Sequence, residues 1–129
     1  ALTTDHSAAK MFLQGMNTDM LSSQGTAIQE AIRMASNYFD DKSPTARLLF
    51  ILSDGEDHEM GATEIATEAQ EKGIHIYTIG IGTEKGAPIP IKDGGEQTYK
   101  RDRNGEVVIT KLNRELLQQI AINAGGANI

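Results

Sequence analysis

Apolar residues recur at helical spacing in four stretches of the chain. The first covers residues 4–14 and the second covers residues 26–39. A third stripe covers residues 62–69, and a fourth follows Asn113, a residue type that suits the N-cap position of a helix. This 3.6-residue repeat predicts four amphipathic helices, each followed by a glycine or a polar break.

Two apolar runs have the composition of β-strands that are covered on both faces. Residues 48–52 are Leu-Leu-Phe-Ile-Leu and show no alternation, and residues 74–81 are rich in β-branched side chains. The helical stripe between them makes one strand–helix–strand crossover unit. The pattern therefore predicts an α/β fold with a parallel sheet.

The pattern changes after the second of these strands. Residues 86–90 contain a glycine and two prolines and cannot continue regular structure, and Asn104-Gly105 lies between two short runs. Asn-Gly between such runs favours a two-residue turn with positive φ angles. We therefore predict a β-hairpin near 97–110, with arms at 97–101 and 107–110, that projects from the edge of the sheet.

Composition narrows the classes of function. The chain of 129 residues is 39% hydrophobic, which is enough for the core of one domain, or part of one, and its net charge of −6 argues against nucleic acid as a partner. It contains no cysteine, which excludes disulfides and thiolate metal sites. The longest apolar run falls far short of the ~20 residues that span a bilayer, so we expect this segment to be soluble.

Three segments carry a resemblance to a known family. Residues 48–57 end a strand in Ser53-Asp54-Gly55, Gly25-Thr26 precedes a helix, and residues 76–82 form the next strand. In this order and spacing the chain resembles von Willebrand factor A (vWA) domains, and most closely the bacterial aerotolerance (Bat, BatB-like) membrane proteins. The closer similarity lies in Leu2-Thr3-Thr4-Asp5, Asp54-Gly55-Glu56-Asp57-His58, Gly86-Ala87-Pro88-Ile89-Pro90 and Thr110-Lys111-Leu112-Asn113.

The resemblance implies a Rossmann-like, three-layer α-β-α fold with strand order 3-2-1-4-5-6. Residues 1–129 then form the C-terminal portion of a single vWA-like domain and keep the 4-5-6 side of its sheet. The family's first strand, together with the Asp-x-Ser-x-Ser loop that supplies three metal ligands, would lie before Ala1. We expect the chain to be partial for this reason.

The resemblance also implies a metal-ion-dependent adhesion site (MIDAS), of which Thr26 and Asp54 are the residues in this chain. Ligands gather at the carboxyl ends of parallel strands, where Asp54 should lie and which a helix beginning at Thr26 also faces. Such a site would hold Mg²⁺ or another divalent cation and leave a position for a partner's carboxylate. In the alternative interpretation Thr26 caps its helix and Asp54 caps a turn, with no metal bound in this chain.

The function implied is protein binding within a membrane-associated complex of the bacterial cell envelope, linked to oxidative stress, in a membrane-anchored parent protein and without catalysis. The alternative is a metal-dependent phosphohydrolase-like α/β enzyme, because such enzymes also place an Asp at the end of a strand. The cluster Glu56-Asp57-His58-Glu59 is either a second cation site or negative charge near the N-terminus of a helix. Zincin, nucleophile-elbow and dinucleotide-binding motifs are absent from the sequence.

The predicted strand at 48–52 raises one further expectation. It is central in the family's order, and without a neighbouring first strand one of its edges has unpaired backbone groups. Because both of its faces are apolar, we expect self-association through this strand, which would bury the edge and the exposed side chains.

Overall fold

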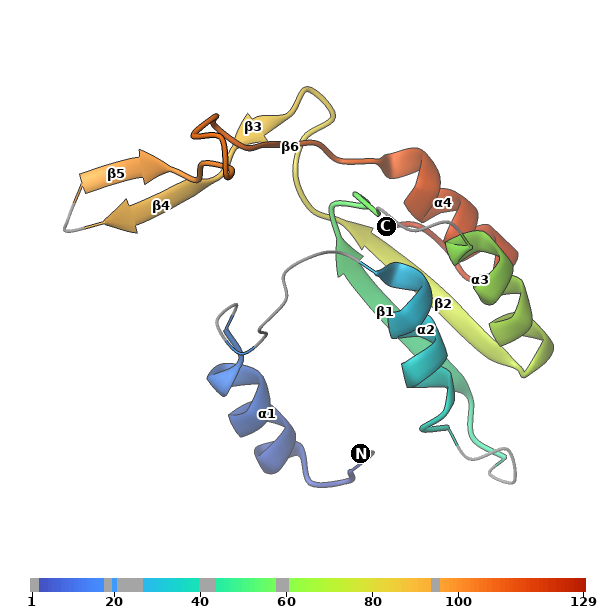
Figure 1. Ribbon diagram of the computed structural model, residues 1–129. Coiled ribbons are helices and arrows are strands. Elements are labelled where there is room, and N and C mark those ends of the chain that lie inside the picture. The colour runs from blue at the N-terminus through green and yellow to red at the C-terminus, as the bar shows by residue number, and fades with distance from the viewer. Residues whose placement is uncertain (1–2, 18–19, 21–26, 40–43, 58–60, 94–95) are drawn as a thin grey trace.

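The computed structural model describes residues 3–17, 20, 27–39, 44–57, 61–93 and 96–129 (Figure 1). Helices and strands alternate from residue 28 to residue 80, as predicted for an α/β fold. In chain order they are α1 (His6–Gly15), α2 (Ile28–Ser36), β1 (Arg47–Ser53), α3 (Ala62–Glu71), β2 (Ile74–Gly80), β3 (Ala87–Pro88), β4 (Pro90–Asp93), β5 (Glu96–Tyr99), β6 (Ile109–Thr110) and α4 (Arg114–Asn123).

The centre of the fold is a parallel pair of strands. β1 and β2 pair in register from Arg47 opposite Ile74 to Ser53 opposite Gly80, and α3 makes the crossover between them. On its other edge β2 pairs in parallel with the end of the chain, where Thr78 N donates to Ala127 O at 3.1 Å and Ile129 N donates to Thr78 O at 2.8 Å. The predicted parallel sheet is confirmed, with β2 in its middle.

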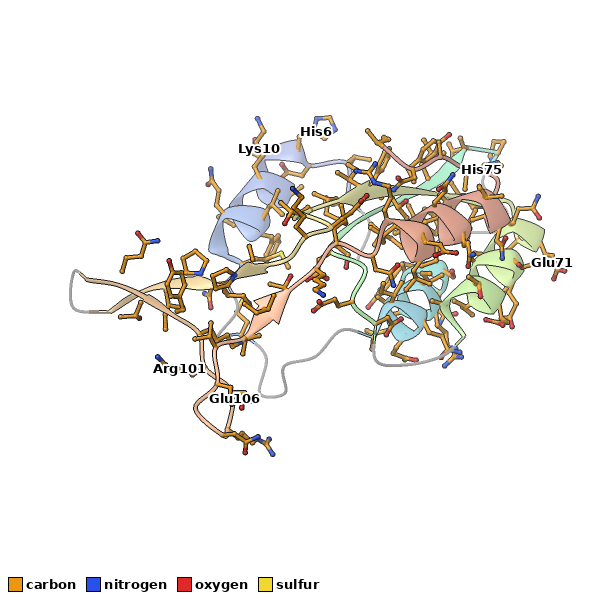
Figure 2. All side chains as sticks on the ribbon, turned by 90° about the horizontal axis from the view of Figure 1, so that it is seen from above. His6, Lys10, Glu71, His75, Arg101 and Glu106 are labelled. Atoms are coloured by element: carbon orange, nitrogen blue, oxygen red, sulfur yellow. The ribbon has the colours of Figure 1, made fainter. Side chains whose placement is uncertain are left out.

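Three helices cover one face of this sheet. Figures 1 and 2 show α2, α3 and α4 side by side against β1 and β2. The largest fully buried side chains between them are those of Ile32, Ile74, Ile76, Leu117 and Ile120. Burying each isoleucine or leucine stabilises the fold by roughly 1.5–3 kcal/mol, so this interface is the main hydrophobic core.

One polar side chain lies inside this core. Thr78 is fully buried, and its hydroxyl donates to Leu117 O at 2.9 Å while it accepts from Asn128 Nδ2 at 2.9 Å. Both hydrogen-bonding roles of the hydroxyl are therefore used, so its burial carries little desolvation penalty. The same hydroxyl ties α4 and the C-terminal segment to β2.

The opposite face of the sheet carries large apolar side chains. Along β1, Leu49 and Ile51 pack toward the core, whereas Leu48, Phe50 and Leu52 are exposed. The Phe50 ring stacks on Tyr77 of β2 with ring centroids 5.3 Å apart. We call this surface the outer face and define it by Leu48, Phe50, Leu52, Tyr77 and Ile79. The prediction that β1 is apolar on both faces is confirmed, and in the described part of the chain only one face is covered.

Two of the described helices begin at a capping side chain, and the predicted cap at Asn113 is one of them. Asp5 caps α1 by accepting from Ser7 N and Ala8 N, and Asn113 caps α4 by accepting from Leu116 N. The predicted start of the second helix at Thr26 lies outside the described residues. That helix ends at Ser36 rather than at Phe39, and the Ser36 hydroxyl donates back to the carbonyl of Ile32.

Residues 84–93 and 96–111 form an arm that projects beyond the carboxyl ends of β1 and β2 (Figure 1). A chain reversal between residues 101 and 107 is confirmed, but the predicted pairing of 97–101 with 107–110 along its length is wrong. β5 pairs with β4, and β6 pairs with β3, so that only Arg101 bridges Val107. Segment 87–93 pairs instead with both of the predicted hairpin strands. Its prolines keep the backbone extended, and they are tolerated because a strand at the edge of a sheet leaves some N–H groups unpaired.

The turn in the arm also differs from the expected type. Gly105 has a φ of +83°, but no described non-glycine residue, Asn104 included, has a positive φ. The Asp102 carboxylate accepts from Asn104 N at 2.8 Å and from Glu106 N at 2.9 Å, and Gly105 N donates to Asp102 O. The aspartate therefore selects a three-residue loop with a glycine bulge over the two-residue turn that Asn-Gly alone favours.

A glycine lets the C-terminal segment lie against β2, and this contact yields a stability prediction. A Cβ added at Gly126 would overlap the carbonyl oxygen of Ile76, so we expect Gly126→Ala to destabilise the fold by about 1–3 kcal/mol. Urea unfolding followed by circular dichroism measures the effect. Gly15→Ala is the control, because an added Cβ there meets nothing within 4 Å. Equal unfolding midpoints for the two variants would contradict this packing.

Candidate functional site

The site is built on the turn that follows β1. Gly55 has a φ of +75°, and a Cβ there would lie 2.6 Å from Asn113 O, so only glycine fits. Gly55 N donates to Ser53 Oγ at 3.0 Å, and Asn113 N donates to Asp54 O at 2.7 Å. The Ser53-Asp54-Gly55 turn is therefore locked against the N-terminus of α4.

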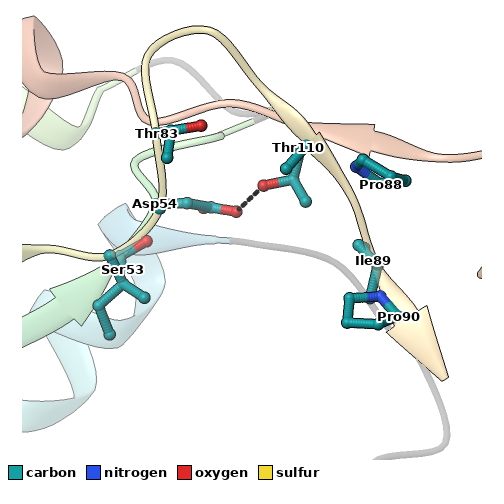
Figure 3. A pocket seen from close by; sticks show the side chains of 10 residues that line it. Ser53, Asp54, Thr83, Pro88, Ile89, Pro90 and Thr110 are labelled. Atoms are coloured by element: carbon teal, nitrogen blue, oxygen red, sulfur yellow. Dashed lines mark hydrogen bonds between the residues drawn. The ribbon is translucent and has the colours of Figure 1, made fainter. Parts of the chain in front are cut away.

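The Asp54 side chain joins this turn to the arm. Its Oδ1 accepts from Glu56 N and its Oδ2 accepts from the Thr110 hydroxyl, both at 3.1 Å, as Figure 3 shows for Thr110. Glu56 strengthens the same connection, because its Oε1 accepts from Lys111 N at 2.7 Å. Within the described part of the chain, both hydrogen-bond partners of the Asp54 carboxylate are uncharged.

A pocket of about 470 Å³ lies between the end of the sheet and the arm. We call it the Asp54 pocket (Figure 3). The described part of its lining contains one ionisable side chain, the half-buried Asp54, together with three hydroxyl groups and an apolar wall. The lining residues are Ser53, Asp54, Ile81, Gly82, Thr83, Ala87, Pro88, Ile89, Pro90 and Thr110.

Of the two predicted metal ligands, Asp54 is among the described residues and Thr26 is not. Asp54 lies at the carboxyl edge of the sheet, as its position after a strand predicted, and it faces a pocket. Thr26 lies outside the described residues, so the expected convergence of the two stays a prediction. Residues 58 and 59 of the acidic cluster also lie outside them, and Glu56 binds the backbone of Lys111.

Sequence reasoning missed the arm residues that complete the pocket. Thr83, Pro88, Ile89 and Thr110 were not predicted to contribute to a site. The signal available was that residues 81–90 follow β2 and so leave the sheet at the same edge as Asp54. The contact between Asp54 and Thr110 spans 56 positions and has no local signature.

The described residues fit a divalent cation in the kind of ligand but not in number. Carboxylate and hydroxyl oxygens are the donors that Mg²⁺ prefers. However, no three His, Asp or Glu side chains gather into a metal-binding group among the residues whose placement is described. Within the described part of the chain, the lining of the Asp54 pocket offers one carboxylate, which is fewer ligands than a divalent cation takes.

A parallel sheet, a crossover helix and an Asp-led turn at the carboxyl edge define an α/β domain of the ligand-binding type. The family model of the von Willebrand factor type A domain matches residues 1–121. The chain belongs to this family, as the resemblance predicted. A search of curated proteins found no match.

Two solved structures are closely similar to the chain. One is the conserved hypothetical protein BatB from Bacteroides thetaiotaomicron, with 42% identity and a TM-score of 0.90 over 98% of this chain and 61% of that one. The other is an aerotolerance-related membrane protein from Bacteroides fragilis NCTC 9343, crystallised with multiple mutations to serines. It has 38% identity and a TM-score of 0.88, over 98% of this chain and 62% of that one.

The chain thus spans about three fifths of the length of these two relatives. Their similarity confirms the predicted relationship to the aerotolerance subgroup. Among the described helices, none is long and apolar enough to cross a membrane.

Proposed function

We propose that this domain is a protein-binding module of a membrane-anchored protein in the bacterial cell envelope, of the aerotolerance type. The single observation that carries the proposal is the Asp54 pocket, which lies where α/β domains bind their ligands and has a preformed wall. Membership of the vWA family supports protein binding. The printed name of one relative, an aerotolerance-related membrane protein, supports the cellular setting and the link to oxidative stress.

The family mechanism, adhesion assisted by a divalent cation, forms part of this proposal. Asp54 and Thr26 are the ligands that this chain would contribute. Both oxygens of the Asp54 carboxylate already accept one hydrogen bond each, and each keeps a further acceptor position. A complete shell around Mg²⁺ needs six oxygen atoms, so most would have to come from water or from other protein ligands.

We therefore expect the chain alone to bind Mg²⁺ weakly or not at all. Titration calorimetry of the wild type and of Asp54→Ala is the measurement. Both should show no heat of saturable binding below about 1 mM cation, because water replaces the missing ligands without a gain in free energy. Tight, stoichiometric binding that is lost in Asp54→Ala would contradict the expectation.

The rival function is hydrolysis of a phosphate ester with a bound metal. Among the described residues that line the Asp54 pocket there is no Lys or Arg that would clamp a phosphate, which favours binding over catalysis. We expect no hydrolysis of p-nitrophenyl phosphate above the buffer rate in the presence of Mg²⁺. Turnover that disappears in Asp54→Ala would overturn the binding module in favour of an enzyme.

Self-association through β1 is the protein contact that we propose for this chain. Among the described strands β1 pairs only with β2, which leaves its other edge open. A groove of about 510 Å³ follows that edge, lined in part by Ile28, Ala31, Met34, Ile51 and Leu52. A second copy that pairs with the edge would cover this groove and the outer face together.

Phe50 provides the test of this contact, because it lies on the outer face and is 53% exposed. Phe50→Lys is expected to raise the dissociation constant of a dimer by at least about tenfold, since burial of a charge there is unfavourable. Light scattering over a concentration series measures this. Ile122→Lys on α4 is the matched control, since Ile122 is 62% exposed and belongs to neither β1 nor the outer face. A wild-type chain that stays monomeric and folded would overturn the contact.

A further inference from the structure

We propose that the projecting arm is a further protein-binding surface, and that it docks a partner segment that carries both apolar and acidic side chains. The inference rests on the proposed function as a protein-binding module, and it deepens that function by naming a second surface and the chemistry of what it binds. The contact needs no metal ion, so it is separate from the cation that the proposed function places at Asp54.

Six side chains surround the point where the strands of the arm meet, and they share one face. Residues directly opposite each other in an antiparallel pair lie on the same face, and so do residues two apart along an extended segment. Three opposite pairs, linked to one another by steps of two residues, therefore form a closed ring. We call this ring the arm face, and its pairs are Pro88 with Ile109, Pro90 with Tyr99, and Arg101 with Val107.

The arm face is mainly apolar, and it is exposed. Ile109 is 50% exposed, Tyr99 45% and Val107 36%, on a part of the chain that projects away from the helices (Figure 1). The hydrogen bond that ties the arm to the Asp54 turn comes from Thr110, whose side chain lies on the opposite face. The side chains of the arm face are thus not needed for that connection. Exposed apolar side chains gathered on one face are typical of an interaction site.

The arm face is ordered before any partner arrives. Proline fixes φ at positions 88 and 90, and the Asp102 carboxylate caps the turn that follows Arg101. Backbone hydrogen bonds among residues 89, 100 and 108 join the strand segments at its centre. The surface therefore loses little conformational entropy on binding. Pro88 and Pro90 also line the Asp54 pocket, so a segment on the arm face adjoins that pocket.

Charge is what selects an acidic partner. Residues 84–111 contain six Lys and Arg against five Asp and Glu, whereas the rest of the chain contains six against thirteen. The rest of the domain therefore repels an acidic segment, and the arm offers such a segment a positive balance of charge. A basic segment would be drawn to the rest of the domain instead.

Arg101 supplies the polar contact within the arm face, on the projecting part of the arm (Figure 2). Its guanidinium donates one N–H to Gly105 O at 2.6 Å, and no carboxylate of the described residues is paired with it. A guanidinium group carries several further donors in a planar fork that matches a carboxylate. A purely apolar segment would cover this group without pairing it, which is unfavourable.

The probe is the capped peptide Asp-Leu-Asp-Leu-Asp-Leu-Asp, added to the ¹⁵N-labelled chain in buffer with EDTA. We expect saturable shifts of the amide signals of Tyr99, Val107 and Ile109, with a dissociation constant of about 1 mM. A peptide with serine in place of leucine loses the apolar contacts, and one with lysine in place of aspartate reverses the charge. Each should bind at least about fivefold more weakly.

Two variants of the arm face test its apolar and its charged part. Tyr99→Ser and Arg101→Gln should each weaken binding of the aspartate-leucine peptide at least about fivefold. Ile122→Ser on α4 and Arg33→Gln on α2 are the matched controls outside the arm, and both should bind as the wild type does. Unchanged amide positions away from each substitution verify that the variant is folded.

Three results would overturn the inference. They are no saturable shift at about 10 mM peptide, binding that is unchanged in Tyr99→Ser and in Arg101→Gln, and binding that requires Mg²⁺ and is lost in Asp54→Ala. The last would place the segment at Asp54 and not on the arm face.

Vesicles of equal parts phosphatidylcholine and phosphatidylglycerol test a different class of partner. We expect the chain not to sediment with them. Sedimentation that is lost in Tyr99→Ser would assign the arm face to a lipid surface and overturn the inference as well. If the peptide fails to bind while dimers sensitive to Phe50→Lys persist, this inference fails and the proposed function stands.

Discussion

The parallel register of β1 and β2 is the constraint on which the rest of the structure depends. It places Ser53 opposite Gly80, so both strands leave the sheet at one level, and Ile81 N donates to Ser53 O at 2.9 Å just beyond. The Asp54 turn and the start of the arm are therefore neighbours before any of their side chains interact. A shift of one residue in this register would also turn Leu49 and Ile51 away from the core.

Two contacts turn this proximity into a site. The turn at Gly55 packs against the N-terminus of α4. Thr110, in β6 at the C-terminal end of the arm, donates a hydrogen bond to Asp54. The first contact fixes the backbone that carries the carboxylate, and the second fixes the carboxylate itself. Both described partners of the Asp54 carboxylate are neutral, so among the described residues its position is fixed by hydrogen bonds and not by an ion pair.

The sequence predicted the features that depend on local composition. The unalternating Leu-Leu-Phe-Ile-Leu run marked a strand of a parallel sheet, although only one face of that strand is covered by the described residues, and Asn113 marked the start of a helix. Asp54 was predicted as a site residue from the resemblance to vWA domains, together with its position after that strand, and its role as a metal ligand stays a prediction. Features that depend on other residues than the turn itself were not predictable. Asn104-Gly105 carries no information about Asp102, which caps the turn. It also carries none about segment 87–93, which pairs with both of the predicted hairpin strands.

In the middle of the arm, three backbone segments form a closed set of hydrogen bonds. Ile89 N donates to Val108 O, Val108 N to Lys100 O, and Lys100 N to Ile89 O, so each of the three residues gives one bond and receives one. Ile89, which lines the Asp54 pocket, therefore has both its backbone N–H and its carbonyl paired within the arm. The three segments therefore hold one another at this level, and the position of the pocket wall does not depend on a neighbouring molecule.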